Sequence, residues 1–361
     1  IKEHDPDVFL NQANNAKKLE ANPVGVKIEN LGQTVNSKFE DKGPAITADG
    51  KKLFFNSRRP ASEDAPRDIE GDGKYFENIY VTTWDSAKQQ WTEADEIPGQ
   101  INQKASHVAC TGISADGKQI FIYKNDVTDA ESRGGDIFVS KVSNNKWRTP
   151  EPFGKPIATI AWEGGACISP DAKTLYFTSE RKAGFGNSDI WMAVRKTKTE
   201  WDTPVNLGSD INSPYDEAGL FLAPDGKTLF FCSNGPNSMG SYDIFRTVYT
   251  DGKWSKPENL GYPINTTKRD CPLVLGADTR YAYFSSDRLG GFGENDIYKV
   301  DLQDYALLEK DFKKQTANSL SIIKGLVRDG FEGKPIEGAE VSFTNDAGEK
   351  CYHDQVDDIC I

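Results

Sequence analysis

Residues 216–233 read DEAGLFLAPDGKTLFFCS, and this stretch decides the fold. It contains an apolar run, a Pro-Asp-Gly turn at 224–226 and a second run of β-branched and aromatic residues, which is the pattern of a β-hairpin. Residues 244–249 then alternate large apolar and polar side chains at period two, as a half-buried strand does. A weaker fourth strand is expected from Trp254 toward Asn265. The whole segment is predicted to be a four-stranded antiparallel unit.

The turn aspartate of this unit returns along the chain. The copies stand at Asp49, Asp116, Asp171, Asp225 and Asp278, so the spacings are 67 (116−49), 55 (171−116), 54 (225−171) and 53 (278−225) residues. A triplet with a central isoleucine and a following aromatic residue, such as Asp243-Ile244-Phe245, accompanies each copy and marks the third strand. Five copies of four strands at a period near fifty predict an all-β fold, a five-bladed β-propeller.

The N-terminal segment is predicted to close the ring. Asn30-Leu-Gly-Gln-Thr-Val-Asn36 matches the segments at 206–212 and 259–265, which follow the third strands of other copies. The fifth copy runs out at residues 299–301 without such a segment. Residues 24–36 are therefore expected to supply the outer strand of the fifth blade, which removes the open sheet edge that a partial ring would leave.

Four segments are expected in this chain. They are a helix at 1–21 that ends a preceding helical domain or docks on the propeller rim, the propeller at 22–303, a linker at 304–320 and part of a small β-domain at 321–361. The last segment alternates at period two around Gly-Pro turns, and about forty residues are too few for a complete core of their own.

The N-terminal helix has a start signal and one apolar stripe. Asp5 is a plausible N-cap with Pro6 at the first helical position. The stripe consists of Phe9, Ala13, Ala16 and Leu19. Further along, residues 61–76 are rich in Asp, Glu, Gly and Pro, and are predicted to be an exposed insertion in the first blade.

Bulk composition excludes some function classes. The chain has 43 basic and 55 acidic side chains and a formal net charge of −12, which argues against nucleic acid as a partner. No apolar run reaches the ~18 residues of a transmembrane segment. The sequence opens at Ile1 without a signal peptide, so a processed or trimmed start is expected.

The six cysteines do not show metal-ligand spacing. Four of them lie in predicted strands and are expected to be small core hydrophobes; these are Cys110, Cys167, Cys232 and Cys271. Cys351 and Cys360 could pair, which would fit an oxidising compartment. Cysteine usage by itself leaves the compartment open.

The repeat carries a family resemblance over most of the chain. The Pro-Asp-Gly-Lys-Thr-Leu-Phe-Phe signature, the Asp-Ile-aromatic triplet and the Leu-Gly-x-x-Ile-Asn-Ser link resemble the PD40 repeats of TolB-type propellers. More closely, the chain resembles Bacteroidetes envelope proteins that join tetratricopeptide helices, a PD40 propeller, a carboxypeptidase-regulatory-like β-domain and an OmpA-like domain. Residues 325–341 are similar to the start of the regulatory-like domain. Among these envelope proteins are components of the type IX secretion system.

That resemblance implies a location and a set of partners. The expected location is the periplasm, in association with the outer membrane through an anchor outside this sequence. The expected partners are other envelope or secretion-system proteins. Peptidoglycan would be bound only through the OmpA-like domain, which this sequence does not include.

Catalytic motifs are not recognisable in the sequence. The three histidines are His4, His107 and His353, and none belongs to a metal-binding or nucleophile motif such as HExxH or GxSxG. His107 is better explained as a polar residue where the first strand of the second blade begins. No catalytic residue, metal site or cofactor is therefore predicted.

Acidic residues cluster by register at one end of the predicted channel. They stand eight or nine residues before the turn aspartates, where the outer strand of one blade leads into the inner strand of the next. The candidate residues are Glu40, Asp41, Glu163, Asp216, Glu217 and Asp270. One interpretation is that they cap backbone N–H groups of that loop. The other is a site for a cation or a basic partner segment, because carboxylates around one axis concentrate negative potential.

The sequence thus favours a non-catalytic protein–protein interaction scaffold of the bacterial envelope, a component of the type IX secretion system, and not an enzyme. The alternative is an envelope hydrolase or a carbohydrate-binding propeller. A pocket lined by paired carboxylates and arginines would favour this alternative.

Overall fold

The computed structural model describes residues 6–124, 135–144, 146–197, 200–305, 307–308, 339–344 and 350–356. The chain divides into two compact units, Ile1–Leu320 and Ser321–Ile361. In the second unit the structure describes one antiparallel hairpin, β24 (Ala339–Thr344) and β25 (Lys350–Val356). The predicted N-cap Asp5 and residues 325–338 of the regulatory-like resemblance lie outside the described residues, as does the Cys360 partner proposed for Cys351.

Five antiparallel sheets in the first unit are the five copies of the sequence repeat. Their first strands are β2 (Asp41–Ile46), β7 (Val108–Ile113), β12 (Glu163–Ile168), β16 (Glu217–Leu222) and β21 (Asp270–Leu275). Their second strands are β3 (Lys52–Ser57), β8 (Gln119–Lys124), β13 (Thr174–Ser179), β17 (Thr228–Ser233) and β22 (Tyr281–Ser286). Their third strands are β4 (Asn78–Asp85), β9 (Asp136–Ser143), β14 (Asp189–Val194), β18 (Asp243–Thr250) and β23 (Asp296–Asp301). The predicted five-bladed β-propeller is confirmed.

The outer strand of each blade is shorter than predicted. Three blades carry two short pieces on the third strand: β5 (Gln90–Trp91) with β6 (Asp95–Glu96), β10 (Lys146–Trp147) with β11 (Glu151–Pro152), and β19 (Lys253–Trp254) with β20 (Glu258–Asn259). Blade three has one bridge at Trp201 and then β15 (Val205–Asn206). In blades two, three and four a proline lies between the two pieces, and proline has no N–H for the ladder.

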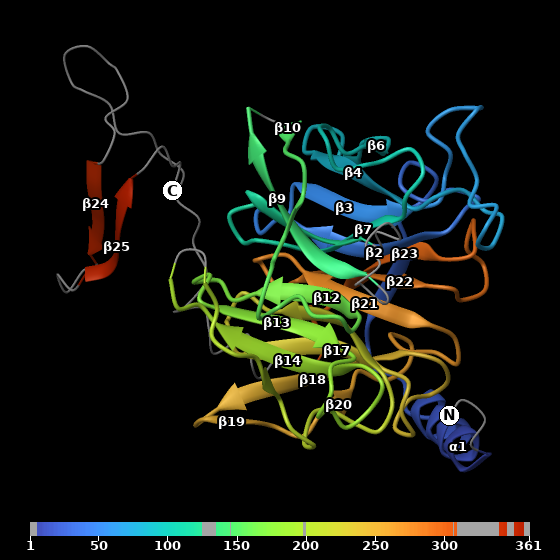
Figure 1. The fold of residues 1–361 in the computed structure, drawn as a ribbon. Coiled ribbons are helices and arrows are strands. Elements are labelled where there is room, and N and C mark those ends of the chain that lie inside the picture. Colours follow the sequence, from blue (N-terminus) through green and yellow to red (C-terminus); the bar gives the residue numbers. More distant parts are fainter. Residues whose placement is uncertain are drawn as a thin grey trace. The chain divides into compact units, whose positions relative to one another are not determined.

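Blade five is completed from the N-terminus, as the sequence predicted. Strand β1 (Lys27–Asn30) pairs antiparallel with β23, with Asn30 opposite Tyr298. In Figure 1 the strands of blade five lie beside those of blade one, so the two ends of the repeat array meet. Asn36 reinforces the junction, because its side chain accepts a hydrogen bond from the Ile297 N–H and donates one to the Ile297 carbonyl.

The five first strands contact one another around the central axis, and the apolar residues of the repeat fill the space between blades. The second-strand residue six positions after the turn aspartate is a fully buried phenylalanine in four of the blades, namely Phe55, Phe177, Phe231 and Phe284. One prediction about this core is wrong. Cys232 of β17 and Cys271 of β21 form a disulfide between blades four and five, because the ring brings their Cα atoms to 6.0 Å. Cys110 and Cys167 are free and buried, as expected.

Helix α1 (Pro6–Glu20) docks on the rim of blade four. The buried side chains are Val8, Gln12 and Ala16, so the predicted apolar face is wrong except for Ala16. Hydrogen bonds of Gln12 explain the difference, because its side chain donates to the backbone carbonyls of Asn234 and Gly235. The side of the helix that carries Gln12 therefore faces blade four, and the Phe9 side chain is 54% exposed. Among the described residues no helix is long and apolar enough to cross a membrane.

The closure of the ring can be tested at Asn36. Replacing Asn36 with alanine leaves the buried N–H of Ile297 without its partner, while the Ile297 carbonyl keeps the hydrogen bond from the Leu31 N–H. We expect the free energy of unfolding to fall by about 1–3 kcal/mol, which is the cost of one buried group left without its hydrogen bond. Urea denaturation measures it, with the exposed Asn22→Ala as the control. Equal midpoints for the two variants would show that Asn36 does not hold the closure.

Candidate functional site

Three blades begin at a buried carboxylate that is tied to its own blade. Asp41, Glu163 and Asp270 have no solvent exposure. Each accepts hydrogen bonds from the backbone N–H and the hydroxyl of a serine or threonine four residues earlier. Each also pairs with an arginine eighteen residues later; the pairs are Asp41 with Arg59, Glu163 with Arg181 and Asp270 with Arg288, at 2.6, 3.2 and 2.7 Å.

Blade four keeps the carboxylate but not the arginine. Glu217 is fully buried and accepts hydrogen bonds from Ser213 and Ser233, while the residue eighteen positions later is Gly235. No ion pair with Glu217 forms among the described residues. Burial therefore raises the pKa of Glu217 to about 8. Asp243 of the same blade is also buried, which raises its pKa to about 7, and its Oδ1 has no hydrogen-bond partner.

The six predicted acidic residues fall into two groups. The four first-strand carboxylates are held inside their own blades. Glu40 and Asp216 are partly exposed: Glu40 contacts Lys42 at 3.1 Å, and Asp216 accepts a hydrogen bond from Asn234. The first group accepts hydrogen bonds from backbone N–H groups of the loop before the first strand, which is the capping role that the sequence suggested. Partner binding at these residues stays a prediction.

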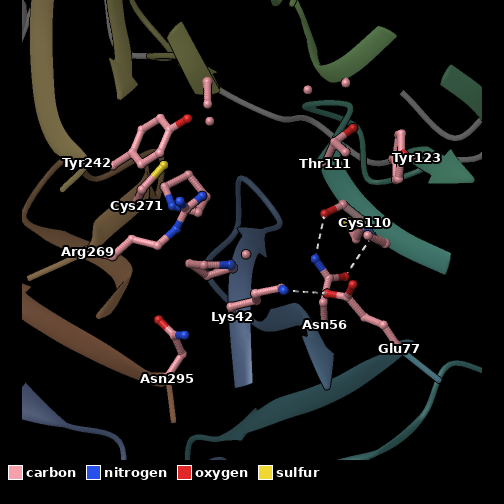
Figure 2. A pocket seen from close by; sticks show the side chains of 18 of the residues that line it. Lys42, Asn56, Glu77, Cys110, Thr111, Tyr123, Tyr242, Arg269, Cys271 and Asn295 are labelled. Atoms are coloured by element: carbon pink, nitrogen blue, oxygen red, sulfur yellow. Dashed lines mark hydrogen bonds and ion pairs between the residues drawn. The ribbon is translucent and has the colours of Figure 1, made fainter. Parts of the chain in front are cut away.

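A pocket of about 440 Å³ lies on the ring axis, at the end where the first strands begin, and Figure 2 shows it from close by. We call it the central pocket. All five blades contribute backbone from their first strands. Its polar and aromatic residues are Lys42, Asn56, Glu77, Thr111, Tyr123, Trp162, Glu180, Ser188, Tyr242, Arg269 and Asn295.

Two carboxylates of the central pocket stand in different environments. Glu77, just before β4, has its Oε1 atom buried and without a hydrogen bond, 3.6 Å from the Lys42 ammonium (Figure 2). Glu180, just after β13, is exposed to the pocket and makes no ion pair among the described residues. Desolvation, and then the charge of Asp216, raise the pKa of Glu180 above its usual value. One carboxylate is thus held beside a cation, while the other has no ion-pair partner among the described residues and a raised pKa.

Aromatic rings form the walls of the central pocket. Trp162 donates a hydrogen bond to the Tyr123 hydroxyl at 3.3 Å, and their ring centroids are 6.1 Å apart. On another side the Arg269 guanidinium lies 4.3 Å from the centroid of the Tyr242 ring. Such a pocket offers flat apolar faces with a few polar groups between them, which is the usual form of a small-molecule site.

Other reactive side chains are held in structural roles. His107 accepts a hydrogen bond from the Glu77 N–H through Nδ1, and its Nε2 lies 3.2 Å from Asp68. Cys110 lines the central pocket, but burial raises its pKa to about 12, so its thiol is not an active nucleophile.

Sequence reasoning missed the pocket residues Glu77, Tyr123 and Glu180, although a signal was present. Glu77 and Tyr242 each precede an Ile-centred triplet, and Glu180 follows Ser179 at the end of the second strand, a position that is serine in four of the five copies. These positions differ from blade to blade. Variable positions beside repeated ones are where a site that breaks the symmetry of the ring can form.

Comparisons with known proteins give a fold. No protein-family profile and no curated protein matches the chain. A TolB-type protein from Agrobacterium tumefaciens is 17% identical, with a TM-score of 0.41 over 72% of this chain and 76% of that chain. An α-L-arabinofuranosidase from Lactobacillus brevis is 14% identical, with a TM-score of 0.45 over 75% and 92%. The periplasmic gluconolactonase PpgL of Pseudomonas aeruginosa is 10% identical, with a TM-score of 0.39 over 88% and 85%. At these identities the likeness is one of fold alone.

These neighbours contradict the prediction of a non-catalytic scaffold and of a protein that is not an enzyme. Two of the three, the α-L-arabinofuranosidase and the gluconolactonase, are enzymes. The prediction failed because it searched for residues close together in sequence. In a propeller, polar groups that meet at the axis come from different blades, as Glu77 and Glu180 do here.

The unpaired carboxylate of blade four predicts a pH dependence of stability. The folded protein keeps a proton on Glu217 that the unfolded chain loses near pH 4.5, so this stabilisation is present at low pH and is lost as pH rises through about 8. At ~1.4 kcal/mol per pKa unit the effect is on the order of a few kcal/mol. Glu217→Gln should make the melting temperature fall less between pH 4.5 and 8 than it does in the parent protein.

Melting curves across that range check the effect, with Glu20→Gln on the exposed end of α1 as the control. A parent slope retained by Glu217→Gln would show that Glu217 ionises normally in the folded state.

Proposed function

We propose that this protein is an envelope hydrolase that binds a carbohydrate in the central pocket and cleaves a glycosidic bond there. The observation that carries the proposal is the pair of carboxylates in unlike environments, Glu77 and Glu180, on the walls of one aromatic pocket.

The aromatic walls support a carbohydrate as the ligand. A sugar ring has apolar C–H faces and polar hydroxyl edges, so it fits between flat aromatic rings and hydrogen-bonding groups. Trp162 and Tyr242 supply the faces, while Asn295 and Lys42 supply polar groups. The volume of about 440 Å³ is within the ~300–1,000 Å³ that ligand pockets span.

The two carboxylates support hydrolysis. Glycosidases pair an acid whose pKa is raised with a second carboxylate that stays ionised. Glu180 is the acid in this proposal: it gives its proton to the leaving oxygen as the bond from the anomeric carbon to that oxygen breaks. Glu77, beside the Lys42 ammonium, is the second carboxylate, which takes a proton from the attacking water. The water hydroxyl forms the new bond to the anomeric carbon, so one water is consumed for each bond that is cleaved.

We place this activity in the periplasm. The Cys232–Cys271 disulfide supports an oxidising compartment, because disulfides persist there and are rare in the cytosol. The resemblance to Bacteroidetes envelope proteins supports the same compartment and an association with the outer membrane. PorE of the type IX secretion system is a named member of that group, and we propose relatedness to that group on the repeat motifs alone.

Replacement of Glu180 tests the proposed acid. Glu180→Gln keeps the shape of the side chain but removes the proton donor, so turnover should fall by about 10²–10⁴-fold. Release of reducing ends from a panel of plant and bacterial polysaccharides measures it, with retained binding in isothermal titration calorimetry as the companion reading. Glu151→Gln on the exposed strand β11 is the matched control.

The outcomes separate binding from catalysis. Binding without product release, unchanged by Glu180→Gln and lost in Trp162→Ala, would assign the pocket to carbohydrate binding alone and would refute the hydrolase. Absence of both binding and release across the panel would refute the proposal as a whole.

A further inference from the structure

Blade four contains a cavity in the place that an arginine side chain fills in three other blades. In blades one, three and five the guanidinium is held in the same way. Arg59, Arg181 and Arg288 each donate Nε–H to the serine two residues earlier and an Nη2–H to both the first-strand carboxylate and a backbone carbonyl twenty-four residues earlier. Three copies of one arrangement in one chain define what a guanidinium site looks like in this fold.

Aromatic stacking is part of that arrangement. Each guanidinium lies over the second-strand phenylalanine of its blade and over the aromatic residue of the triplet. The distances to the ring centroids are 5.3 and 5.0 Å for Arg59, 4.7 and 5.3 Å for Arg181, and 4.9 and 5.1 Å for Arg288. Cation–π contact of this kind adds to the charge-assisted hydrogen bonds.

Blade four has the acceptors of this site without the arginine. The corresponding carboxylate, serine and carbonyl belong to Glu217, Ser233 and Ile211, and the corresponding rings are Phe231 and Phe245, stacked at 5.9 Å. All five residues line one cavity of about 180 Å³, which we call the blade-four cavity. No cation among the described residues pairs with Glu217 or lies over these two rings.

Gly235 explains why the cavity is there. Its N–H donates to Ser233 Oγ, as the N–H of each arginine does to its own serine, so the backbone is the same. Only the side chain is missing. The φ angle of Gly235 is not positive, and a Cβ atom there would meet nothing closer than 3.4 Å. The backbone would therefore accept an arginine at this position.

We propose that the blade-four cavity binds the side chain of an arginine from a partner polypeptide. The guanidinium would take the place of the missing intramolecular one, with Glu217, Ser233 and the Ile211 carbonyl as acceptors and the rings of Phe231 and Phe245 as the stacking surface. Exposed residues at the mouth, among them Asp210, Asn237 and Lys256, leave a path from solvent. The planar guanidinium of arginine, with its five N–H donors, can reach these acceptors while it stacks on the rings. The ammonium of lysine has neither the planar shape nor the fixed donor directions.

The burial of Glu217 makes an incoming cation favourable. A fully buried carboxylate without a counter-charge is costly, and its pKa of about 8 reflects that cost. A bound guanidinium would restore the pairing that the other three blades have. Because the blade-four cavity shares no residue with the central pocket, this site is independent of the proposed hydrolase.

Calorimetry with N-acetyl-arginine amide tests the proposal, and N-acetyl-lysine amide is the matched probe. The parent protein should bind the arginine compound about tenfold or more tightly than the lysine compound, since only the guanidinium makes the bidentate and stacked contacts. Equal binding of the two, or none, would overturn the proposal. Tighter binding of free arginine than of the amide would assign the site to a small metabolite and overturn the polypeptide partner.

Two variants at one residue locate the binding. Gly235→Arg should fill the blade-four cavity from within, abolish binding of N-acetyl-arginine amide and raise the melting temperature. Gly235→Ala leaves the cavity open and should bind within about twofold of the parent, because it removes no acceptor. Binding that survives in Gly235→Arg would place the ligand elsewhere. Hydrolysis on any active substrate should be the same in both variants, which separates this test from that of the central pocket.

Discussion

The ring depends on carboxylates that are buried where one blade leads into the next. A carboxylate with no exposure is tolerated only when hydrogen bonds and a counter-charge replace its water. In Asp41, Glu163 and Asp270 these come from the loop before the first strand and from the arginine after the second strand. Each carboxylate therefore ties three segments of its blade together. Because burying an unpaired charge is costly, the carboxylate also fixes the register of its strand. A shift of the strand by one residue would leave the charge without its partners.

The sequence predicted the fold because the folding residues repeat. The turn aspartates and the Ile-centred triplets recur in all five blades, and an asparagine closes four of them, namely Asn36, Asn102, Asn212 and Asn265. Five copies of one pattern distinguish a structural requirement from chance. The same reasoning predicted β1 as the closing strand, although it placed the apolar face of α1 wrongly. That face depends on Gln12 reaching two carbonyls of blade four, and a tertiary hydrogen bond leaves no periodic signal.

The candidate site was less predictable, for the opposite reason. Its residues occupy repeat positions that vary, and a single sequence does not distinguish useful variation from neutral variation. Glu180, for example, stands where the other described blades have Arg58, Asn234 and Asp287. Glu180 and Glu77 line the same pocket only because the ring closes at five blades. The disulfide between Cys232 and Cys271 was unpredictable for the same reason. The two cysteines are 39 residues apart in the sequence and meet only because their blades pack together.

The ring also explains how one fold can carry two unlike sites. Backbone hydrogen bonds and buried aromatic residues fix the blades, so a side chain at the axis or at the end of a second strand can change without moving the strands. At the axis, that freedom places Glu77, Tyr242 and Asn295 at equivalent positions around one pocket. In blade four it replaces an arginine by glycine while the acceptors around it stay. A cavity of defined chemistry arises from the loss of one side chain, because the framework that held the side chain does not depend on it alone.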